Sequence, residues 1–174
     1  MSDIVTRRSK LPRADARDAR LPLREFLAFV LDGESYALPL EAVREILKVQ
    51  PVTDVPRAAA DVLGIIAVRG RITTVLDMRR LLRVPEAPIE KASRILLVDS
   101  GVEVLGLLVD RVLQVHRLQE DEIELSAALG GDVSEHVMGV GRPRASRGAA
   151  REARELSDPN DILILLDPGH LLRR

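Results

Sequence analysis

The chain has 174 residues, of which 46% are hydrophobic and 30% charged, and its formal net charge is −1. This is the length of one ordinary domain or two small ones, with enough apolar residues for a packed core. With no cysteine, only three aromatic residues and no uncharged apolar run of about 18 residues, the composition excludes thiolate chemistry, disfavours a nucleic-acid binder and predicts no membrane insertion. The N-terminal residues lack the apolar segment of a secretory signal, so we expect a cytoplasmic protein.

Positive charge is concentrated in two segments of the chain. Residues 1–24 carry a net charge of +4 and residues 142–155 carry +3, which leaves −8 for the remainder. Both segments have the low-complexity composition of solvated, unfolded chain. We therefore expect a disordered basic tail over 1–24 and an Arg-rich insertion over 142–156, with an electrostatic tether for an acidic partner as the alternative.

Short apolar runs separated by turn residues dominate the chain from residue 25 onward, and they predict β-strands. The expected strands are 25–31, 35–40, 64–70, 71–77, 94–100, 102–110, 136–141 and 161–167. The sequences LDGES (31–35) and VDSGVE (98–103) contain the Asp, Gly and Ser that tight turns favour. Two antiparallel hairpins of similar design are expected around these turns.

Helix is the minor component of the prediction. The segment 41–47, EAVREIL, places Val43, Ile46 and Leu47 at helical spacing, so a short helix is expected there. Shorter amphipathic turns are expected at 77–83 and 167–172.

An internal duplication becomes visible when the chain is aligned with itself. The matched segments are 26–29 with 95–98 and 41–46 with 110–115 at an offset of 69, 63–65 with 138–140 at 75, and 72–77 with 162–167 at 90. The last increase of 15 residues falls across the Arg-rich segment, which marks that segment as an insertion in the second copy. Two similar all-β halves predict two small barrels that share an interface, because closure removes the open edges of short sheets.

Sequence motifs of common enzymes and metal sites are absent from the chain. There is no phosphate-binding loop, no HExxH and no G-x-S-x-G, and none of the three histidines has the spacing of a metal motif. The acidic run at 120–124 is typical of a solvated face. We therefore expect a binding protein rather than an enzyme, without cofactor or metal.

Two charged residues stand out against their apolar neighbours. Arg69 and Gly70 separate two apolar runs, which fits either an exposed turn or an arginine presented beside an apolar groove. Glu45 lies between apolar residues, where an exposed helix carboxylate and a partner contact are both open.

At these residues the sequence resembles the CheW family of chemotaxis coupling proteins. The family pattern is matched by FLAFVLDGESYALPL, VREI and VLGIIAVRGRITTVLDMRRLL in the first half, and by RILLVDSGVEVLGLLVDRVLQV, VMGV and DILILLDPGHLL in the second. The resemblance runs from about residue 25 to 172. It implies a mainly β fold of two pseudo-symmetric five-stranded Greek-key barrels with short helices, the first over about 26–92 and the second over about 93–172.

The resemblance also implies a function. A family member would be a noncatalytic adaptor between the regulatory domain of a CheA-type histidine kinase and the cytoplasmic tips of methyl-accepting chemoreceptors, recruited to receptor arrays in the cytoplasm. Its receptor groove would lie between the two barrels, and the kinase would contact barrel edges and loops. The receptor-binding positions carried over to this sequence are Val43, Glu45, Gly64 and Arg69, with Val112 and Val115 in the same wall.

Three features depart from the family pattern. Ala67 stands where the family usually has Asn, Arg94 stands in a usually apolar strand, and the insertion after Gly141 is unusual. They favour, as an alternative, a specialised CheW-like paralogue that binds only receptor or only kinase in a non-standard chemosensory pathway.

Overall fold

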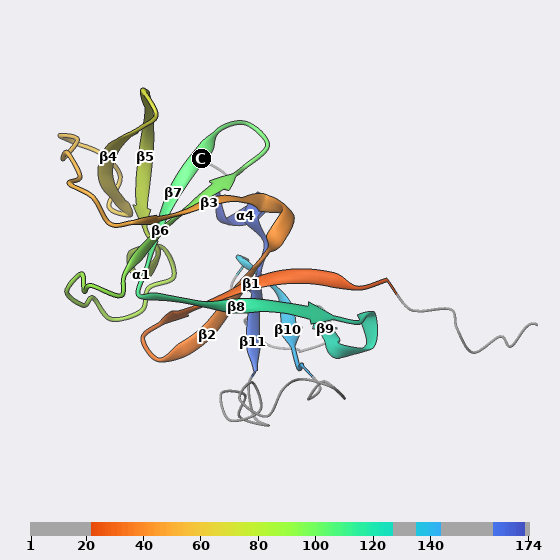
Figure 1. The fold of residues 1–174 in the computed structure, drawn as a ribbon. Helices are drawn as coiled ribbons and strands as arrows, with labels where there is room; N and C mark the ends of the chain where they lie inside the picture. Colours follow the sequence, from red (N-terminus) through yellow and green to blue (C-terminus); the bar gives the residue numbers. More distant parts are fainter. Residues whose placement is uncertain (1–21, 127–134, 144–161, 173–174) are drawn as a thin grey trace, which may run out of the picture.

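The computed structural model describes residues 22–126, 135–143 and 162–172 (Figure 1). The expected basic tail over 1–24 therefore lies outside the described residues except for its last three positions. The expected Arg-rich insertion over 142–156 lies outside them from residue 144 onward.

The described residues form two sheets and only short helices (Figure 1). Sheet A has the order β8-β1-β2-β11-β10-β9, formed by β1 (Arg24–Leu31), β2 (Glu34–Pro39), β8 (Arg111–Leu118), β9 (Ile123–Leu125), β10 (Val137–Gly141) and β11 (Leu163–Leu166). Sheet B has the order β3-β6-β7-β5-β4, formed by β3 (Val43–Lys48), β4 (Val62–Val68), β5 (Arg71–Asp77), β6 (Arg94–Asp99) and β7 (Val104–Val109). The helical segments are η1 (Leu40–Ala42), α1 (Met78–Leu81), η2 (Glu120–Glu122) and α4 (Pro168–Leu171).

The two sheets repeat one arrangement. In each sheet an antiparallel hairpin lies between an outer strand and a strand that runs parallel to the second strand of the hairpin. This parallel pair is β2 with β11 in sheet A, and β7 with β5 in sheet B. The short β9 next to β10 has its counterpart in the single bridge between Thr53 and Ile65 of β4. The prediction of a mainly β, pseudo-symmetric fold is confirmed.

The order of the strands corrects the boundaries expected for two barrels, 26–92 and 93–172. The β1–β2 hairpin of the first sequence copy lies in sheet A with β8–β11 of the second copy, and the β6–β7 hairpin lies in sheet B with β3–β5 of the first. Sheet B is thus formed by the continuous segment 43–109, whereas sheet A combines strands from both ends of the chain.

Three hydrophobic clusters show how each hairpin packs in the sheet formed mainly by the other copy. A central cluster takes side chains from both sheets, and each sheet also curves around a cluster of its own that includes both of its outer strands. In β1, Phe26 and Ala28 pack into the cluster of sheet A, while Leu27 and Phe29 pack into the central cluster. A strand buried on both faces is apolar at every position, and this gives the continuous runs seen in the sequence.

The predicted hairpin turns are confirmed. Leu31 pairs with Glu34 across Asp32 and Gly33, whose φ angles of 53° and 82° are those of a primed turn. The β6–β7 hairpin closes through residues 100–103, with Gly101 at a φ of 85°.

The helix expected over 41–47 is wrong. Only η1 is helical there, and Val43–Lys48 forms β3, which pairs with β6. A bulge between Val43 and Glu45 lets Val43 pair with Val98 and Ile46 with Leu96, both members of the central cluster. Val43 and Ile46 therefore share one face of the strand although they are three residues apart. A bulged strand thus reproduces the apolar spacing that is typical of a helix.

Two strands in the second half had not been predicted. One is β8, which follows β7 after the single residue Asp110, and the other is β9 within the acidic segment. The two short helical turns expected at 77–83 and 167–172 are confirmed as α1 and α4, and the carboxylates of Asp77 and Asp167 cap their N-termini.

Candidate functional site

The strand β3 presents two apolar side chains toward the other sheet. Val43 is partly buried and packs against the central cluster, and Ile46 is 45% exposed. Because the bulge places both on the face of β3 that points away from the interior of sheet B, they extend the central cluster to the surface.

The strand β8 repeats this arrangement in sheet A. Val112 pairs with Phe29 and packs against the central cluster, and Val115 pairs with Leu27 and is 42% exposed. A register shift in the pairing with β1 again brings two valines three residues apart onto one face. Val43 with Ile46 and Val112 with Val115 are thus equivalent pairs, separated by 69 residues in sequence.

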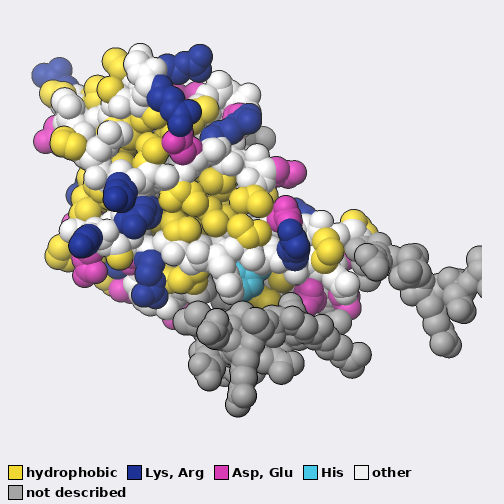
Figure 2. Space-filling view, in the orientation of Figure 1, with side chains coloured by type: hydrophobic (Ala, Val, Ile, Leu, Met, Phe, Trp, Pro, Cys, Tyr) yellow, Lys and Arg dark blue, Asp and Glu magenta, His cyan; other side chains and the backbone are white. Residues whose placement is uncertain are grey.

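Figure 2 shows the consequence of this arrangement on the surface. Hydrophobic side chains gather in the middle of the face, where β3 of sheet B approaches β1 and β8 of sheet A in the same view of Figure 1. We call the surface formed by Val43, Ile46, Val112 and Val115 the β3–β8 surface. Monomeric proteins rarely leave a contiguous apolar patch uncovered, and such patches commonly mark binding sites.

An ion pair lies on the opposite face of β3. Arg69, in the turn between β4 and β5, donates from Nη2 to Oε1 of Glu45 at 2.8 Å. Since β3 and β4 are the outermost strands of sheet B, this contact exists only because the sheet curves until its edges meet. Glu45 pairs with Leu97 of the sheet B cluster, which places it on the interior side of the strand.

Arg69 occupies a backbone conformation that arginine rarely adopts. Its φ is 49° and that of Gly70 is 79°, so the β4–β5 hairpin closes with a primed turn that favours Asn, Asp or Gly. The left-handed conformation costs a non-glycine residue roughly 1–2 kcal/mol. The side chain remains 79% exposed, and an ion pair with such exposure contributes little. The arginine is therefore poorly explained by stability.

Gly64 has a structural role in β4. A Cβ atom at this position would lie 2.4 Å from the carbonyl oxygen of Thr53 and 2.6 Å from Cγ1 of Val52. Its counterpart Gly139 would place a Cβ 2.4 Å from the carbonyl oxygen of Glu124. The same close approach in both sheets indicates that Gly64 supports the strand that leads to Arg69.

The six residues predicted from the sequence thus fall into three groups. Val43, Val112 and Val115 belong to the β3–β8 surface, Glu45 and Arg69 form the ion pair on the other side of β3, and Gly64 lies in β4. Sequence reasoning did not include Ile46 among the site residues and placed it, with Val43 and Leu47, on one face of an expected short helix. Its match with Val115 in the internal duplication was the signal that could have identified it.

Two negative observations apply to the part of the chain that the structure describes. Within it, no three His, Asp or Glu side chains are grouped closely enough to hold a metal ion. No helix in the same ranges is long and apolar enough to cross a membrane.

Comparison with known proteins identifies relatives along most of the chain. The family profile described as the CheW-like domain matches residues 25–174. Protein FrzA of Myxococcus xanthus is 36% identical over 129 residues, which cover 74% of this chain and 79% of the relative. The chemotaxis protein CheW of Bacillus subtilis is 33% identical over 100 residues, which cover 58% of this chain and 64% of the relative.

A solved structure shares the fold. The scaffolding protein TtCheW of Thermoanaerobacter tengcongensis superposes with a TM-score of 0.72 at 24% identity, covering 88% of this chain and 94% of that protein. The likeness extends over both sheets, so the placement of each hairpin in the sheet of the other copy belongs to a known fold.

Proposed function

Because this chain belongs to the CheW-like domain family, we propose that it is a noncatalytic adaptor that couples a CheA-type histidine kinase to the cytoplasmic tips of chemoreceptors. A scaffold role in chemotactic signalling is supported by the relatives, which include proteins named chemotaxis protein CheW and scaffolding protein. The two partners themselves are the further step of the proposal.

The β3–β8 surface is the observation that carries this proposal. It exposes apolar side chains from both sheets at the point where the sheets meet, which is the surface that an amphipathic helix of a receptor tip would cover. Val43 and Val112 would form the floor of the contact, and Ile46 and Val115 would be buried by the receptor helix. This burial would supply the apolar part of the binding free energy.

Arg69 and Glu45 would add polar specificity from the other face of β3, which is an outer strand of sheet B. An exposed guanidinium presents several donors in a fixed plane, so Arg69 can reach acceptors on a partner helix while Glu45 holds its orientation. The strained turn fits this role, because backbone strain of this kind is retained where a side chain must be presented in a fixed position. Gly64 would contribute indirectly, by seating β4 against Thr53.

The kinase would bind elsewhere on the same molecule, through sheet edges and loops, so that both partners are held together. Binding should be measured by isothermal titration with the receptor signalling domain and the CheA regulatory domain from the same genome. The proposal predicts that each partner binds and that the protein retains both in one complex on a sizing column. Binding of only one partner would establish the specialised paralogue instead, and binding of neither would refute the adaptor role.

A further inference from the structure

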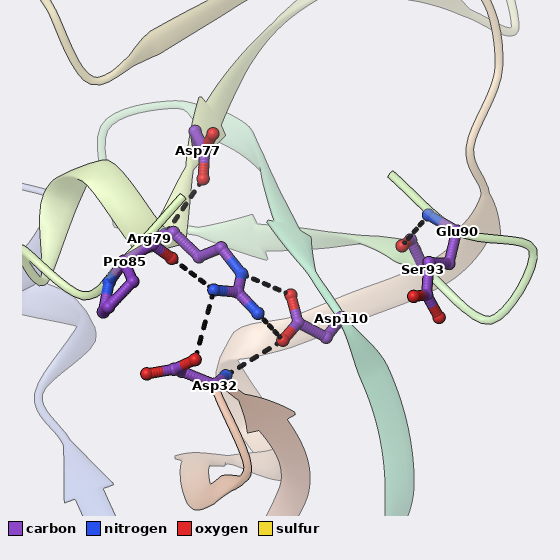
Figure 3. Close-up of polar contacts among 7 residues, drawn as sticks. All are labelled: Asp32, Asp77, Arg79, Pro85, Glu90, Ser93 and Asp110. Atoms are coloured by element: carbon purple, nitrogen blue, oxygen red, sulfur yellow. Dashed lines mark hydrogen bonds and ion pairs between the residues drawn. The ribbon is translucent and has the colours of Figure 1, made fainter. Parts of the chain in front are cut away.

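A nearly buried arginine holds together three parts of the chain (Figure 3). Arg79 in α1 is 12% exposed, and its guanidinium donates from Nε to Oδ1 of Asp110 at 2.8 Å and from Nη2 to Oδ2 at 2.5 Å. It also donates to the carbonyl oxygen of Pro85 and lies 3.6 Å from Oδ1 of Asp32. Such a two-pronged contact with a carboxylate fixes both distance and orientation.

Asp110 is the residue at which the chain passes from one sheet to the other. It stands alone between the end of β7 in sheet B and the start of β8 in sheet A. Its Oδ2 accepts a hydrogen bond from the backbone N–H of Asp32 at 3.0 Å, and its own N–H donates to the carbonyl oxygen of Val30 at 3.2 Å. Asp110 is thereby tied to α1 on one side and to the β1–β2 turn of sheet A on the other.

This contact breaks the pseudo-symmetry of the molecule. The three positions that correspond to Arg79, Asp110 and Asp32 in the other copy are Gly169, Glu41 and Gly101, at the offsets of 90 and 69 found in the sequence. Two of these are glycines and have no side chain to donate or accept. The corresponding passage between the sheets, η1, also has no side chain capping its N-terminus. An ion pair beside that passage, Arg44 with Asp99, joins two strands of sheet B and does not tie a helix to η1. The fold thus forms one of its passages without a link of the Arg79–Asp110 kind, so folding alone does not account for Arg79.

The position of β8 depends on the contact between Arg79 and Asp110, which we call the joint. Val112 lies two residues after Asp110 and Val115 five, so the joint sets where β8 begins relative to sheet B. Val43 and Ile46 on β3 belong to sheet B. The helix α1 directly follows β5 of the same sheet. A link between α1 and Asp110 therefore fixes one half of the β3–β8 surface against the other.

We propose that Arg79 is a positioning residue for receptor binding, which through Asp110 holds β8 at a fixed distance from β3 and so keeps the two halves of the β3–β8 surface in register. This inference rests on the adaptor function proposed above. In this role Arg79 does not touch the receptor. It restricts the movement of the two sheets relative to each other at Asp110. A surface that is already arranged for its partner binds more tightly because less ordering is needed on association.

Two measurements on the full chain test this inference. The chain has no cysteine, so spin labels can be introduced at Lys48→Cys on β3 and Gln114→Cys on β8, both exposed, and their separation measured by pulsed electron paramagnetic resonance without any partner. The second measurement is the affinity for the receptor signalling domain. The test variant is Arg79→Met combined with Asp110→Asn, which removes the contact without leaving a buried unpaired charge, because Asp32, the other carboxylate beside Arg79, is 47% exposed. The matched control is Arg80→Met in the same helix, whose side chain is more exposed.

The double variant should broaden the distance distribution and weaken receptor binding by about 3- to 30-fold, the range for residues that act on a site from a distance. Arg80→Met should change neither. A distance distribution as narrow as that of the control would overturn the inference, as would a broadened distribution with unchanged affinity or a lost affinity at unchanged distance. If circular dichroism shows that the double variant is unfolded, Arg79→Lys takes its place, because it keeps the charge but loses the two-pronged contact. A narrow distribution in that variant also contradicts the inference.

The failure of the adaptor function would look different. In that case the unmodified protein would not bind the receptor domain at all, whereas the distance measurement would still decide whether Arg79 holds the two strands in place.

Discussion

The contacts of Arg69 within the described residues do not explain why an arginine occupies this turn. Its backbone lies in the left-handed region, its side chain is largely exposed, and among the described residues it forms an ion pair with the partly exposed Glu45. Neither the turn nor the ion pair requires arginine, because glycine or asparagine suits the turn better and exposed pairs contribute little. A partner that accepts hydrogen bonds from the guanidinium, as proposed above, would provide the missing reason.

Replacing Arg69 by alanine should therefore separate binding from folding. The variant should keep its thermal stability within about 0.5 kcal/mol, as exposed substitutions do, and weaken receptor binding by about 1–2 kcal/mol. Arg57→Ala is a matched control, because Arg57 is also exposed and has a φ of 62°. Titration calorimetry and thermal unfolding measure the two effects. Equal losses of affinity in both variants, or unfolding of Arg69→Ala, would contradict the proposed contact.

The surroundings of Asp110 should make the free energy of unfolding depend on pH. Burial raises the pKa of Asp110, but the hydrogen bonds from Arg79 and from the N–H of Asp32, with the charge of Arg79, outweigh it and hold the pKa below its ordinary value. A carboxylate with a depressed pKa stabilises the fold above its unfolded-state pKa of about 3.9, and this contribution is lost as the pH falls through the lower folded-state pKa.

The stability that Asp110 adds should therefore shrink in acid. Urea unfolding should show the unmodified protein more stable than Asp110→Asn at neutral pH, and the difference should decrease as the pH is lowered below about 4. A difference that stays constant or grows in acid would mean that the charge of Asp110 does not stabilise the fold.

At the scale of the strands, the sequence predicted those elements whose local chemistry is unambiguous. The hairpins around Asp32 and Gly101 were predicted because their turns need positive φ angles and contain the residues that supply them. The strand β3 was mistaken for a helix because a bulge gives it apolar residues three apart. A bulge is set by pairing with another strand, which a periodicity within one segment cannot reveal.

The same bulge limited the prediction of the site. Val43, Glu45, Gly64, Arg69, Val112 and Val115 were proposed through a resemblance, not through the geometry that brings Val43, Val112 and Val115 onto one surface. Ile46, placed with Val43 on one face of an expected helix, was not among them, although it is the exposed counterpart of Val115.

Gly64 provides a test of how β4 is seated. Gly64→Ala should destabilise the protein by about 2–4 kcal/mol, because the added Cβ meets the backbone oxygen of Thr53 in addition to the strain of the positive φ. Gly101→Ala is the control, since its φ is 85° and nothing lies within 4 Å of the added atom. It should cost only about 1 kcal/mol. Chemical denaturation of both variants gives the comparison, and equal losses would show that the close approach to Thr53 is readily relieved.

At the scale of the whole molecule, the sequence revealed two copies but not how they combine. The hairpins are apolar on both faces, so no alternation of polar and apolar residues indicates which sheet each one joins. The structure places each hairpin with the other copy, in the manner of an exchanged dimer within one chain.

This exchange predicts how the protein responds to being cut. Fragments 1–87 and 88–174, divided in the exposed segment before β6, should each lack a hairpin that completes a sheet. Neither should unfold cooperatively alone, whereas a mixture should form a one-to-one complex with the β-sheet spectrum of the intact chain. Circular dichroism and a sizing column measure this, and a cooperative transition in either isolated fragment would show that a copy folds independently.

Whether the receptor binds where the two sheets meet can be measured by a titration followed through methyl groups by NMR. With the receptor signalling domain added to the full chain, the signals of Ile46, Val112 and Val115 should shift together. Those of Val55 and Ile89, which are 40% and 49% exposed in the loops that precede β4 and β6, should remain in place. Shifts confined to Val55 and Ile89, with Ile46 and Val115 unchanged at saturation, would refute binding at the β3–β8 surface.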